Sequence, residues 1–316
     1  MQLANYIDLD LVLAIYNGER FLPQLLDSLH AQSRSGWRMI YRDDGSDDKS
    51  IQVLQNYNSS NFNIIRDTSV QGNLGVIGNF SCLLQQSDAS YVMLADQDDV
   101  WYSEKIAKSF AAIRQLERNE AGVIQPALVF TDVNVVDVDI NILSPSFVKM
   151  QGLERLLKPK FNQLLTQNVA PGCTMIVNRA LLDLALPIPM EAAMHDWWLM
   201  QVASLFGRIG YIDEPTMAYR QHGGNQVGAP SRSLNAMLQD IRNGGVGYKK
   251  RLLQAQLQAG ALIARYAEKM DRSDLATASV YASLPTRPLL LRQIIAWRYG
   301  LRKAGFIRNA GFYFLM

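Results

Sequence analysis

Over the first two thirds of the chain, short apolar runs alternate with segments of helical periodicity. The run "DLVLAIYN" is followed by "FLPQLLDSLHAQ", whose apolar side chains recur at helical spacing: Phe21, Leu22, Leu25, Leu26 and Leu29. The same alternation returns in "WRMIYRDDGSDDKSIQVLQNY", with Ser46 or Asp47 as the helix cap, in "FNIIRD" with "GVIGNFSCLLQQS", and in "YVMLADQDD" with "WYSEKIAKSFAAIRQLE". This pattern predicts an α/β fold with parallel strand pairing and helices on both faces of the sheet.

The pattern becomes less regular after a fifth predicted strand, "PALVFTDVNVVD". We expect a helix in "FNQLLTQN", a strand running into a helix in "GCTMIVNRALLDLAL", a helix in "MHDWWLMQVASLFG" and a short strand in "RIGYID". Beyond Gly228 only helical patterns follow. We therefore predict a sheet domain over residues 1–228 and a helical, basic region over residues 229–316, with the boundary near Pro230.

Composition narrows the class of protein. With 316 residues, of which 48% are apolar, the chain can bury a large core, and a formal charge of +2 argues against nucleic-acid binding. Cys82 and Cys173 are far apart and lack metal-ligand spacing, so neither a zinc site nor a disulfide scaffold is indicated, and a cytoplasmic location is the default. The sequence start lacks the features of a secretory signal, and no window approaches the roughly 20 apolar residues of a membrane span. We expect a soluble or peripherally attached protein.

Three carboxylates crowd the stretch "ADQDDVW" directly after an apolar run. Asp96 and Asp98, two residues apart, can direct oxygen atoms at one divalent cation, and Mg²⁺ typically combines one or two carboxylates with phosphate oxygens and water. The alternative is a solvated helix start, in which Asp99 stabilises the helix dipole. The spacing alone leaves both interpretations open.

Two further polar segments follow the predicted strands. In "RDDGSDD", Asp43 or Asp44 could accept a hydrogen bond from a base or a ribose, although a plain Asp-Gly turn with a helix cap explains the same residues. In "QGNLGVIGN", Gly72, Gly75 and Gly78 fit neither the GxGxxG fingerprint nor a P-loop, but their backbone N–H groups could approach a phosphate.

The segments "MHDWW" and "YRQHGGNQVG" add the remaining candidates. Asp196 beside two tryptophans is expected to be partly desolvated, which raises the pKa of a carboxyl group and suits it to accept a proton; a helix cap with a core tryptophan pair is the alternative. Arg220 and His222 precede a glycine-rich loop and suit a leaving diphosphate, whereas a lone histidine is usually structural.

Taken together, these segments resemble glycosyltransferase family 2, and more narrowly its bacterial rhamnosyltransferase-like members. The likeness spans roughly Leu9 to Gly228 and rests on seven motifs in order: "LAIYNGERFLPQLLDSLHAQS", "RDDGSDDKS", "NLGVIGNF", "ADQDDVW", "PGCTMIVNRALL", "HDWW" and "YRQHGGN". The resemblance implies the Rossmann-like GT-A fold, with a mixed, mainly parallel sheet, and an inverting enzyme that uses nucleotide-sugar donors.

The resemblance also implies roles for individual residues. Those expected along the nucleotide or its diphosphate are Ala14, Tyr16, Asn17, Glu19, Asn73, Gly75, Arg220 and His222. Asp44, with Asp43 beside it, matches the base-contacting aspartate; Asp96 is expected near the ribose and Asp98 as the direct ligand of Mg²⁺ or Mn²⁺. Asp196 matches the catalytic base. His195 stands where the family usually has an acidic residue, and "YRQH" replaces a Gln-x-x-Arg-Trp motif, so the second acidic contact to the acceptor and the roles of the closing loop are left open.

The implied reaction is a single displacement that transfers a sugar from a dTDP- or UDP-linked donor to a hydroxyl group of the acceptor. L-Rhamnose from dTDP-rhamnose is the expected donor sugar, and the acceptor is a bacterial surface glycan such as O-antigen, capsule or another lipid-linked oligosaccharide. A sugar-nucleotide pyrophosphorylase is the first alternative, but "YNGERF" lacks the glycine-rich basic signature that it needs. A non-catalytic nucleotide-sugar-binding scaffold is the second, and the presence of Asp98 and Asp196 disfavours it.

The C-terminal segment is basic and lacks acidic residues. After Asp274 no carboxylate follows, while apolar side chains are interleaved with Arg287, Arg292, Arg298, Arg302, Lys303 and Arg308. Such a segment is typical of an interfacial contact with anionic lipid, here the cytoplasmic face of the inner membrane. The alternative is a basic helical hairpin packed on the sheet domain or on a second subunit, as in a homodimer.

Overall fold

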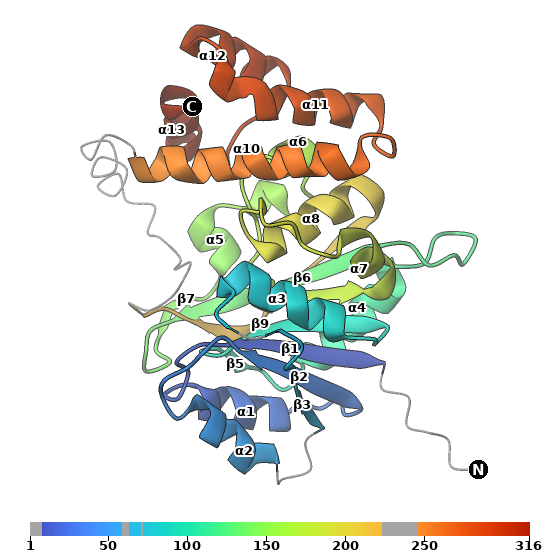
Figure 1. Ribbon diagram of the computed structural model, residues 1–316, viewed down its shortest axis with the longest axis vertical. Coiled ribbons are helices and arrows are strands. Elements are labelled where there is room, and N and C mark those ends of the chain that lie inside the picture. The colour runs from blue at the N-terminus through green and yellow to red at the C-terminus, as the bar shows by residue number, and fades with distance from the viewer. Residues whose placement is uncertain (1–7, 59–62, 71, 223–245) are drawn as a thin grey trace.

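In the part of the chain that the structure describes, nine strands form one mixed sheet at the centre of the molecule, in the order β3-β2-β1-β4-β8-β6-β9-β5, with β7 paired to β6 (Figure 1). The computed structural model describes residues 8–58, 63–70, 72–222 and 246–316. The N-terminal strands are β1 (Leu9–Ile15), β2 (Trp37–Asp43), β3 (Ile64–Arg66) and β4 (Tyr91–Asp96). The others are β5 (Val100–Trp101), β6 (Ala127–Val136), β7 (Ile142–Ser144), β8 (Met175–Asn178) and β9 (Arg208–Arg220).

Helices cover both faces of the sheet, as predicted. One face carries α1 (Leu22–His30), α2 (Ser50–Asn58) and α4 (Lys105–Leu116); the other carries α3 (Gly75–Gln86), α7 (Arg179–Ala185) and α8 (His195–Phe206). The alternation of side chains along β1 serves both faces, because Leu11 and Leu13 enter the core beneath α1 while Val12 enters the core beneath α3 and α8. Fully buried strands therefore read as continuous apolar runs in the sequence.

The pairing of the strands departs from the expectation of a purely parallel arrangement. β1 pairs in parallel with β2 and β4, but β8 runs antiparallel to both β4 and β6. Parallel strands are usually joined by a crossover helix, and the described segment before β8 has no long helix of this kind. β8 is preceded instead by the short helices α5 (Phe147–Gln151) and α6 (Phe161–Leu164) and a 3₁₀ turn. The sheet is thus mixed, which confirms the fold class that the resemblance implied.

Three local expectations were wrong. Trp101, predicted as the start of a helix, forms the short strand β5 together with Val100, opposite Met217 and Ala218. The strand predicted at "RIGYID" continues to Arg220, because β9 pairs with β6 along nearly its full length. Helix α2 begins at Ser50 rather than after Ser46 or Asp47, because the Ser46 hydroxyl and the Asp47 N–H bond to Asn17 instead of capping a helix.

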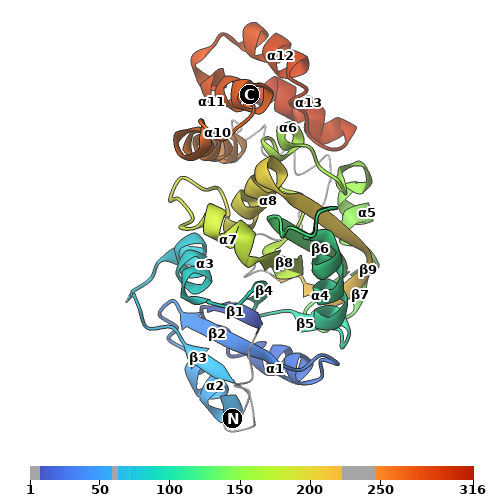
Figure 2. The ribbon, with the colours of Figure 1, turned by 90° about the vertical axis from the view of Figure 1, so that its right-hand side faces the viewer.

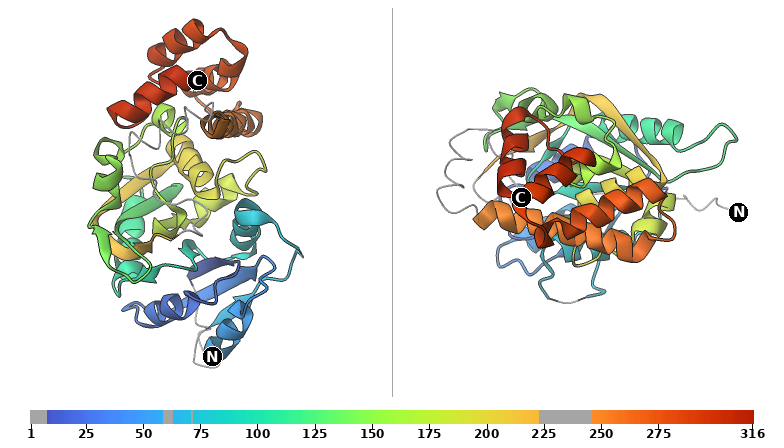
Figure 3. Two further views of the ribbon diagram at one scale, coloured as in Figure 1. Left: turned by 90° about the vertical axis from the view of Figure 1, so that its left-hand side faces the viewer. Right: turned by 90° about the horizontal axis from the view of Figure 1, so that it is seen from above.

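The C-terminal helices form a layer at one end of the elongated molecule, opposite α2 and β3 (Figures 2 and 3). They are α10 (Val246–Tyr266), α11 (Arg272–Ser283), α12 (Leu289–Arg298) and α13 (Phe306–Leu315). Buried residues of this layer, such as Leu262, Tyr281 and Phe312, belong to the same core cluster as Trp198 of α8. The predicted boundary near Pro230 lies outside the described residues.

No helix in the described parts of the chain is both long enough and apolar enough to cross a membrane.

Candidate active site

The candidate residues gather at the edge where the parallel strands β1, β2 and β4 end. The register places Ile15 opposite Asp43 and Ala14 opposite Asp96, so the three strands finish at the same level. The loops that follow therefore lie side by side, and polar side chains from distant sequence positions meet there.

Asp44 is engaged by neighbouring groups. Its carboxylate accepts hydrogen bonds from the Arg42 guanidinium (2.6 Å) and from the backbone N–H groups of Leu74 and Gly75 (2.8 Å each), and only 4% of the residue is exposed. Asp44 thus fixes the start of α3 to the end of β2. The sequence assigned the contact to a base first to Asp44. The neighbouring residue is more accessible and is therefore the better candidate for this contact.

That neighbour, Asp43, is partly exposed. It accepts hydrogen bonds from the Ser46 hydroxyl (2.5 Å) and from the Ser46 N–H (3.2 Å), which orient the carboxylate at the end of β2. Asp43 ends β2, and the exposed residues Tyr16 and Asn17 directly follow the adjacent strand β1 at the same edge.

The glycine-rich segment has a structural role in this state. Gly75 adopts a left-handed conformation (φ 66°), and its N–H donates to Asp44 and to the Asn73 side chain (3.1 Å). The Gly75 N–H, one of those expected to meet a phosphate, therefore points at carboxylate and amide oxygens. Asn73 and Gly75 remain at the edge, but no geometry here assigns them to a ligand.

The Asp96–Asp99 turn holds the acidic cluster. Asp98 Oδ2 lies 2.8 Å from His222 Nε2, and the His222 ring stacks on Phe21 with 4.8 Å between centroids. Asp99 is buried, and its Oδ1 accepts the Arg220 N–H (3.1 Å), while its Oδ2 has no hydrogen-bond partner among the described residues.

Burial dominates the electrostatics of this turn. Burial, and next the charge of Asp98, raises the pKa of Asp96 to about 7, and the same two causes raise the pKa of Asp99 well above its usual range. A carboxyl group in such surroundings is stabilised by any cation that enters the turn.

The chemistry of the donor atoms indicates which cation fits. Ligand atoms of Asp96, Asp99 and Cys173 lie within 4.8 Å of one another, yet burial raises the pKa of the Cys173 thiol, which stays protonated and is a poor ligand. Carboxylate oxygens, with the His222 nitrogen at hand, suit Mg²⁺ or Mn²⁺ better than a thiol-binding metal. The turn therefore fits a hard divalent cation.

Arg220 holds the Asp96–Asp99 turn in place through hydrogen bonds. It is 1% exposed, its guanidinium donates to the backbone oxygen of Asp98 (2.7 Å) and to Val138 O and Gln24, and it lies over the Phe21 ring. These contacts fix the path of the turn. The contact between Arg220 and a diphosphate, which was expected from the sequence, stays a prediction.

Asp196 occupies the start of α8 and is 6% exposed. The N–H of Trp197 donates to its Oδ1 (2.6 Å), and the Gly172 N–H and the Asn168 side chain also donate to the carboxylate. Burial outweighs these hydrogen bonds and raises the pKa of Asp196 to about 6. Such a carboxylate is ionised at neutral pH and still basic enough to accept a proton.

His195, beside Asp196, is a neutral buried ring. It stacks on Phe80 (3.9 Å between centroids), and burial lowers its pKa to about 3. A Cβ added to Gly172 would lie 2.7 Å from His195 Nε2 and 3.4 Å from Asp196 Cβ, so this position requires glycine. His195 thus supplies no charge near Asp196.

Sequence reasoning missed the segment Gly172–Cys173. Gly172 donates to Asp196, and Cys173 interacts with Asp96 and Asp99, so two adjacent residues touch both parts of the site. The Pro-Gly pair before a strand was the available signal, and "PGC" was part of a quoted motif without a role. Gln97, the middle residue of the acidic turn, was likewise passed over.

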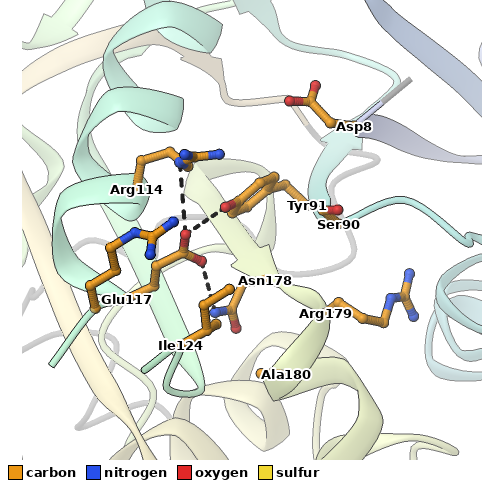
Figure 4. Close-up of a pocket in the computed structure, with 10 residues that line it drawn as sticks. Asp8, Ser90, Tyr91, Arg114, Glu117, Ile124, Asn178, Arg179 and Ala180 are labelled. Atoms are coloured by element: carbon orange, nitrogen blue, oxygen red, sulfur yellow. Dashed lines mark hydrogen bonds and ion pairs between the residues drawn. The ribbon is translucent and has the colours of Figure 1, made fainter. Parts of the chain in front are cut away.

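A hollow of about 380 Å³ lies at the opposite end of β1 and β4 and contains none of the predicted site residues (Figure 4). Glu117 on its wall is buried and accepts from the Tyr91 hydroxyl (2.6 Å) and the Asn178 amide (3.2 Å). These bonds tie the end of α4 to β4 and β8, which accounts for Glu117 as a structural residue.

Comparison with known proteins identifies relatives of this chain. Residues 10–182, more than half of the chain, match the family described as Glycosyl transferase family 2. The dTDP-rhamnosyl transferase RfbG of Shigella flexneri is 28% identical over 229 residues, which cover 69% of this chain and 74% of that protein.

Two solved structures share the fold. S. aureus TarS 1–349 in complex with UDP-GlcNAc superimposes with a TM-score of 0.53 at 16% identity and covers 93% of both chains. The mannosyltransferase PcManGT from Pyrobaculum calidifontis, in complex with GDP-Man and Mn²⁺, gives a TM-score of 0.54 at 13% identity and covers 93% of this chain and 80% of its own. The GT-A architecture predicted from the sequence is thereby confirmed.

Proposed function

Because this chain belongs to glycosyl transferase family 2, we propose that it is a metal-dependent, inverting enzyme that transfers a sugar from a nucleoside diphosphate to a glycan hydroxyl. One observation carries the proposal. Gly172 packs against Asp196, whose pKa is raised by burial, while the adjacent Cys173 and the charge of Asp196 both act on Asp96, so the proposed proton acceptor and the proposed cation site are neighbours.

Asp196 is the proton acceptor in this proposal. The acceptor hydroxyl attacks the anomeric carbon, its proton passes to the Asp196 carboxylate, and the bond from the anomeric carbon to the diphosphate oxygen breaks. One displacement inverts the anomeric configuration, and no covalent intermediate on the protein is required. The N–H groups of Trp197 and Gly172 hold the carboxylate in place.

The nucleotide lies along the edge formed by Ala14, Tyr16, Asn17 and Glu19. Asp43, which is partly exposed, contacts the base, and Asp96 lies near the ribose. Asp44 supports this surface through Arg42 and the start of α3 rather than through the ligand.

Asp98 would hold Mg²⁺ or Mn²⁺, with His222 beside it as a second ligand or as a contact to the diphosphate. When bound, the cation stabilises the charge that develops on the departing diphosphate. Arg220 keeps the turn in place so that Asp98 presents its oxygen atoms.

L-Rhamnose from dTDP-rhamnose is the donor that we propose first, because RfbG, a dTDP-rhamnosyl transferase, covers most of this chain. The acceptor is a hydroxyl group of a bacterial surface glycan such as O-antigen, capsule or another lipid-linked oligosaccharide.

The test is a screen of dTDP-, UDP- and GDP-linked sugars for metal-dependent release of the nucleoside diphosphate by the purified protein. We expect one donor class to react with Mn²⁺ present and to stop reacting when EDTA is added. Asp98→Ala should abolish the metal-dependent binding of that donor. Turnover that is indifferent to EDTA would reject the metal assignment, and no turnover with any donor would reject the proposed function.

The helical layer is proposed to contact an anionic membrane surface. Exposed apolar side chains gather on α10, α12 and α13, with the largest exposed fractions at Phe306 (89%), Trp297 (77%), Leu290 and Phe314 (75% each). A groove of about 520 Å³ between α10, α12 and the C-terminus has Leu253, Leu289 and Phe314 on its wall and Lys249 and Arg292 at its edges.

The positive charge of the helical layer indicates which partner fits this surface. Residues 246–316 contain 12 basic and 3 acidic residues, and burial, with Arg251 and Arg308 as like charges nearby, lowers the pKa of Lys303 to about 8. Lipid phosphates would relieve this repulsion while the apolar side chains enter the interface. A second copy of the chain would repeat the same positive charge, which disfavours a homodimer through this face.

Vesicle flotation tests the membrane contact. We expect binding to vesicles with 30% phosphatidylserine to fall at least tenfold in Leu290→Ser/Trp297→Ser, because both side chains are exposed and neither supports the core. Ile142→Ser/Leu143→Ser is the matched control, since these exposed apolar residues (63% and 61%) lie in the sheet half. Equal binding by both variants, or a loss of dimer instead of vesicle binding, would overturn the proposal.

A further inference from the structure

The loop that follows β1 is held by side chains from two other loops. Four consecutive backbone N–H groups, those of Tyr16, Asn17, Gly18 and Glu19, each donate to a side-chain oxygen. The acceptors in the same order are Gln97 Oε1 (3.0 Å), Ser46 Oγ (2.9 Å), Ser50 Oγ (2.8 Å) and Asp48 Oδ2 (2.9 Å). The loop is thus bonded to the β2–α2 segment on one side and to the acidic turn on the other.

Gln97 makes the connection to the acidic turn. Its side-chain amide accepts from the Tyr16 N–H (3.0 Å) and donates to the Tyr16 carbonyl oxygen (2.8 Å). The pair of bonds resembles one rung of a β-ladder, so it fixes both the position of the loop and the orientation of the amide. Asp96 and Asp98 flank Gln97, and any shift of the Gln97 backbone shifts both carboxylates.

The neighbouring backbone is shaped to receive this amide. A Cβ on Gly18 would lie 2.5 Å from Gln97 Oε1 and 2.8 Å from Gln97 Cδ, so the position is glycine for reasons of space. Asn17 has a positive φ of 51°, a conformation that a residue other than glycine keeps only when its surroundings enforce it. Its N–H and side chain bond to Ser46 and Asp47.

We propose that Gln97 is a positioning residue that couples the nucleotide-binding loop, Tyr16–Glu19, to the metal-binding turn, Asp96–Asp98. This inference rests on the proposed function, because it assigns the nucleotide to the first segment and the cation to the second. A nucleotide that orders the loop also orders the turn, so nucleotide and cation each raise the affinity for the other by the same factor.

Isothermal titration with dTDP and, in parallel, with UDP, each with and without Mn²⁺, measures this coupling. In the wild type we expect Mn²⁺ to raise the nucleotide affinity at least tenfold. In Gln97→Ala the enhancement should fall about tenfold, as expected for the loss of two neutral hydrogen bonds. Gln97→Asn, which is one methylene too short to reach Tyr16, should show the same loss.

A double-mutant cycle makes the test specific to the contact. Gly18→Ala should reduce the enhancement in the wild type, where the new methyl group strikes the amide, and should have a smaller further effect in Gln97→Ala, where only the contact to Leu22 Cγ (3.3 Å) remains. Gln85→Ala is the control for the loss of a glutamine, since among the described residues Gln85 bonds only to Ser81 within its own helix α3. Thermal melts of every variant separate a loss of coupling from a loss of folded protein.

The outcomes separate this inference from the proposed function. A wild type that binds no nucleotide with Mn²⁺ present would reject the proposed function itself. A wild type that binds nucleotide without enhancement by Mn²⁺ would reject the metal assignment and, with it, this inference. A Gln97→Ala variant that keeps the full enhancement, or additive effects of the Gly18 and Gln97 substitutions, would each overturn the role of Gln97 alone.

Discussion

The two halves of the molecule use their polar residues in opposite ways. Residues 1–245 contain 26 acidic and 19 basic residues, a net charge of −7, whereas residues 246–316 carry a net charge of +9. In the sheet half, carboxylates and hydroxyls bond to backbone N–H groups of neighbouring loops, as Asp44 does with Leu74 and Gly75. In the helical layer, large apolar side chains such as Trp297 and Phe306 are exposed instead.

Under the proposed function, this difference separates two tasks. A site that must hold a diphosphate and a cation needs fixed geometry, and side-chain hydrogen bonds to loop backbone provide it. A surface that meets a fluid partner needs area and charge more than fixed geometry, and exposed apolar and basic groups provide those. The two halves nevertheless share one core. Gln258 of α10 accepts a hydrogen bond from the N–H of Ala193 (2.7 Å), which lies just before α8, and donates one to Gln201 within α8. Helix α8 carries Asp196.

The largest effect is expected in the sheet half, at Asp196. Asp196→Asn removes the proton acceptor and keeps its size, so transfer should fall about 10³-fold while donor affinity stays within twofold. Steady-state kinetics and titration with dTDP measure the two quantities. Asp183→Asn is the control, because Asp183 is an exposed carboxylate on α7. Undiminished transfer by Asp196→Asn would mean that Asp196 is not the base.

The next effect tests the helical layer. Replacement of Arg298 and Arg302 by Gln removes two exposed charges worth about 1 kcal/mol each at an anionic surface, so vesicle affinity should fall about 30-fold. Transfer to a water-soluble acceptor should be unchanged. Arg66→Gln/Arg118→Gln removes two exposed charges from the sheet half, and an equal loss in this control would mean that the contact is not confined to the helical layer.

A smaller effect concerns pH. Burial raises the pKa of Asp196 to about 6, so the carboxyl group is protonated below that pH and cannot accept a proton. The transfer rate should fall tenfold per pH unit below about 6 and level off above it. His195, whose pKa burial lowers to about 3, stays neutral across this range, so His195→Asn should leave the midpoint in place. A rate that rises as the pH falls would contradict the assignment.

The smallest effect is on stability. Asp271 caps α11 by accepting from the N–H groups of Ser273 and Asp274 (2.9 Å each), and Asp271→Ala should lower the free energy of unfolding by about 1 kcal/mol. Urea unfolding measures this change. Donor binding should be unaffected, and a weakened donor affinity would show that the two halves are more closely coupled than their contacts indicate.

The sequence predicted the elements with strong periodicity and missed the contacts that depend on side-chain direction. The apolar spacing of Leu22, Leu25, Leu26 and Leu29 identified α1, and seven ordered motifs indicated the family. Trp101 was placed in a helix because a strand of two residues has no period to detect.

The assignment of single acidic residues was harder for a physical reason. Asp43 and Asp44 are adjacent and chemically identical, and only the fold shows that Arg42 and the start of α3 engage the second of them. Likewise the partners of Arg220, Gln24 and Val138, are distant in sequence, so a buried supporting role could not be distinguished from a contact to a ligand.

The anomeric configuration of the product tests the central claim most directly. With a donor that reacts in the screen, proton NMR of the product, recorded before mutarotation where water is the acceptor, reports the configuration at the transferred carbon. A single displacement assisted by Asp196 predicts the anomer opposite to that of the donor. Retention of the donor configuration would contradict the account, because a single displacement opposite the departing diphosphate always inverts the anomeric carbon.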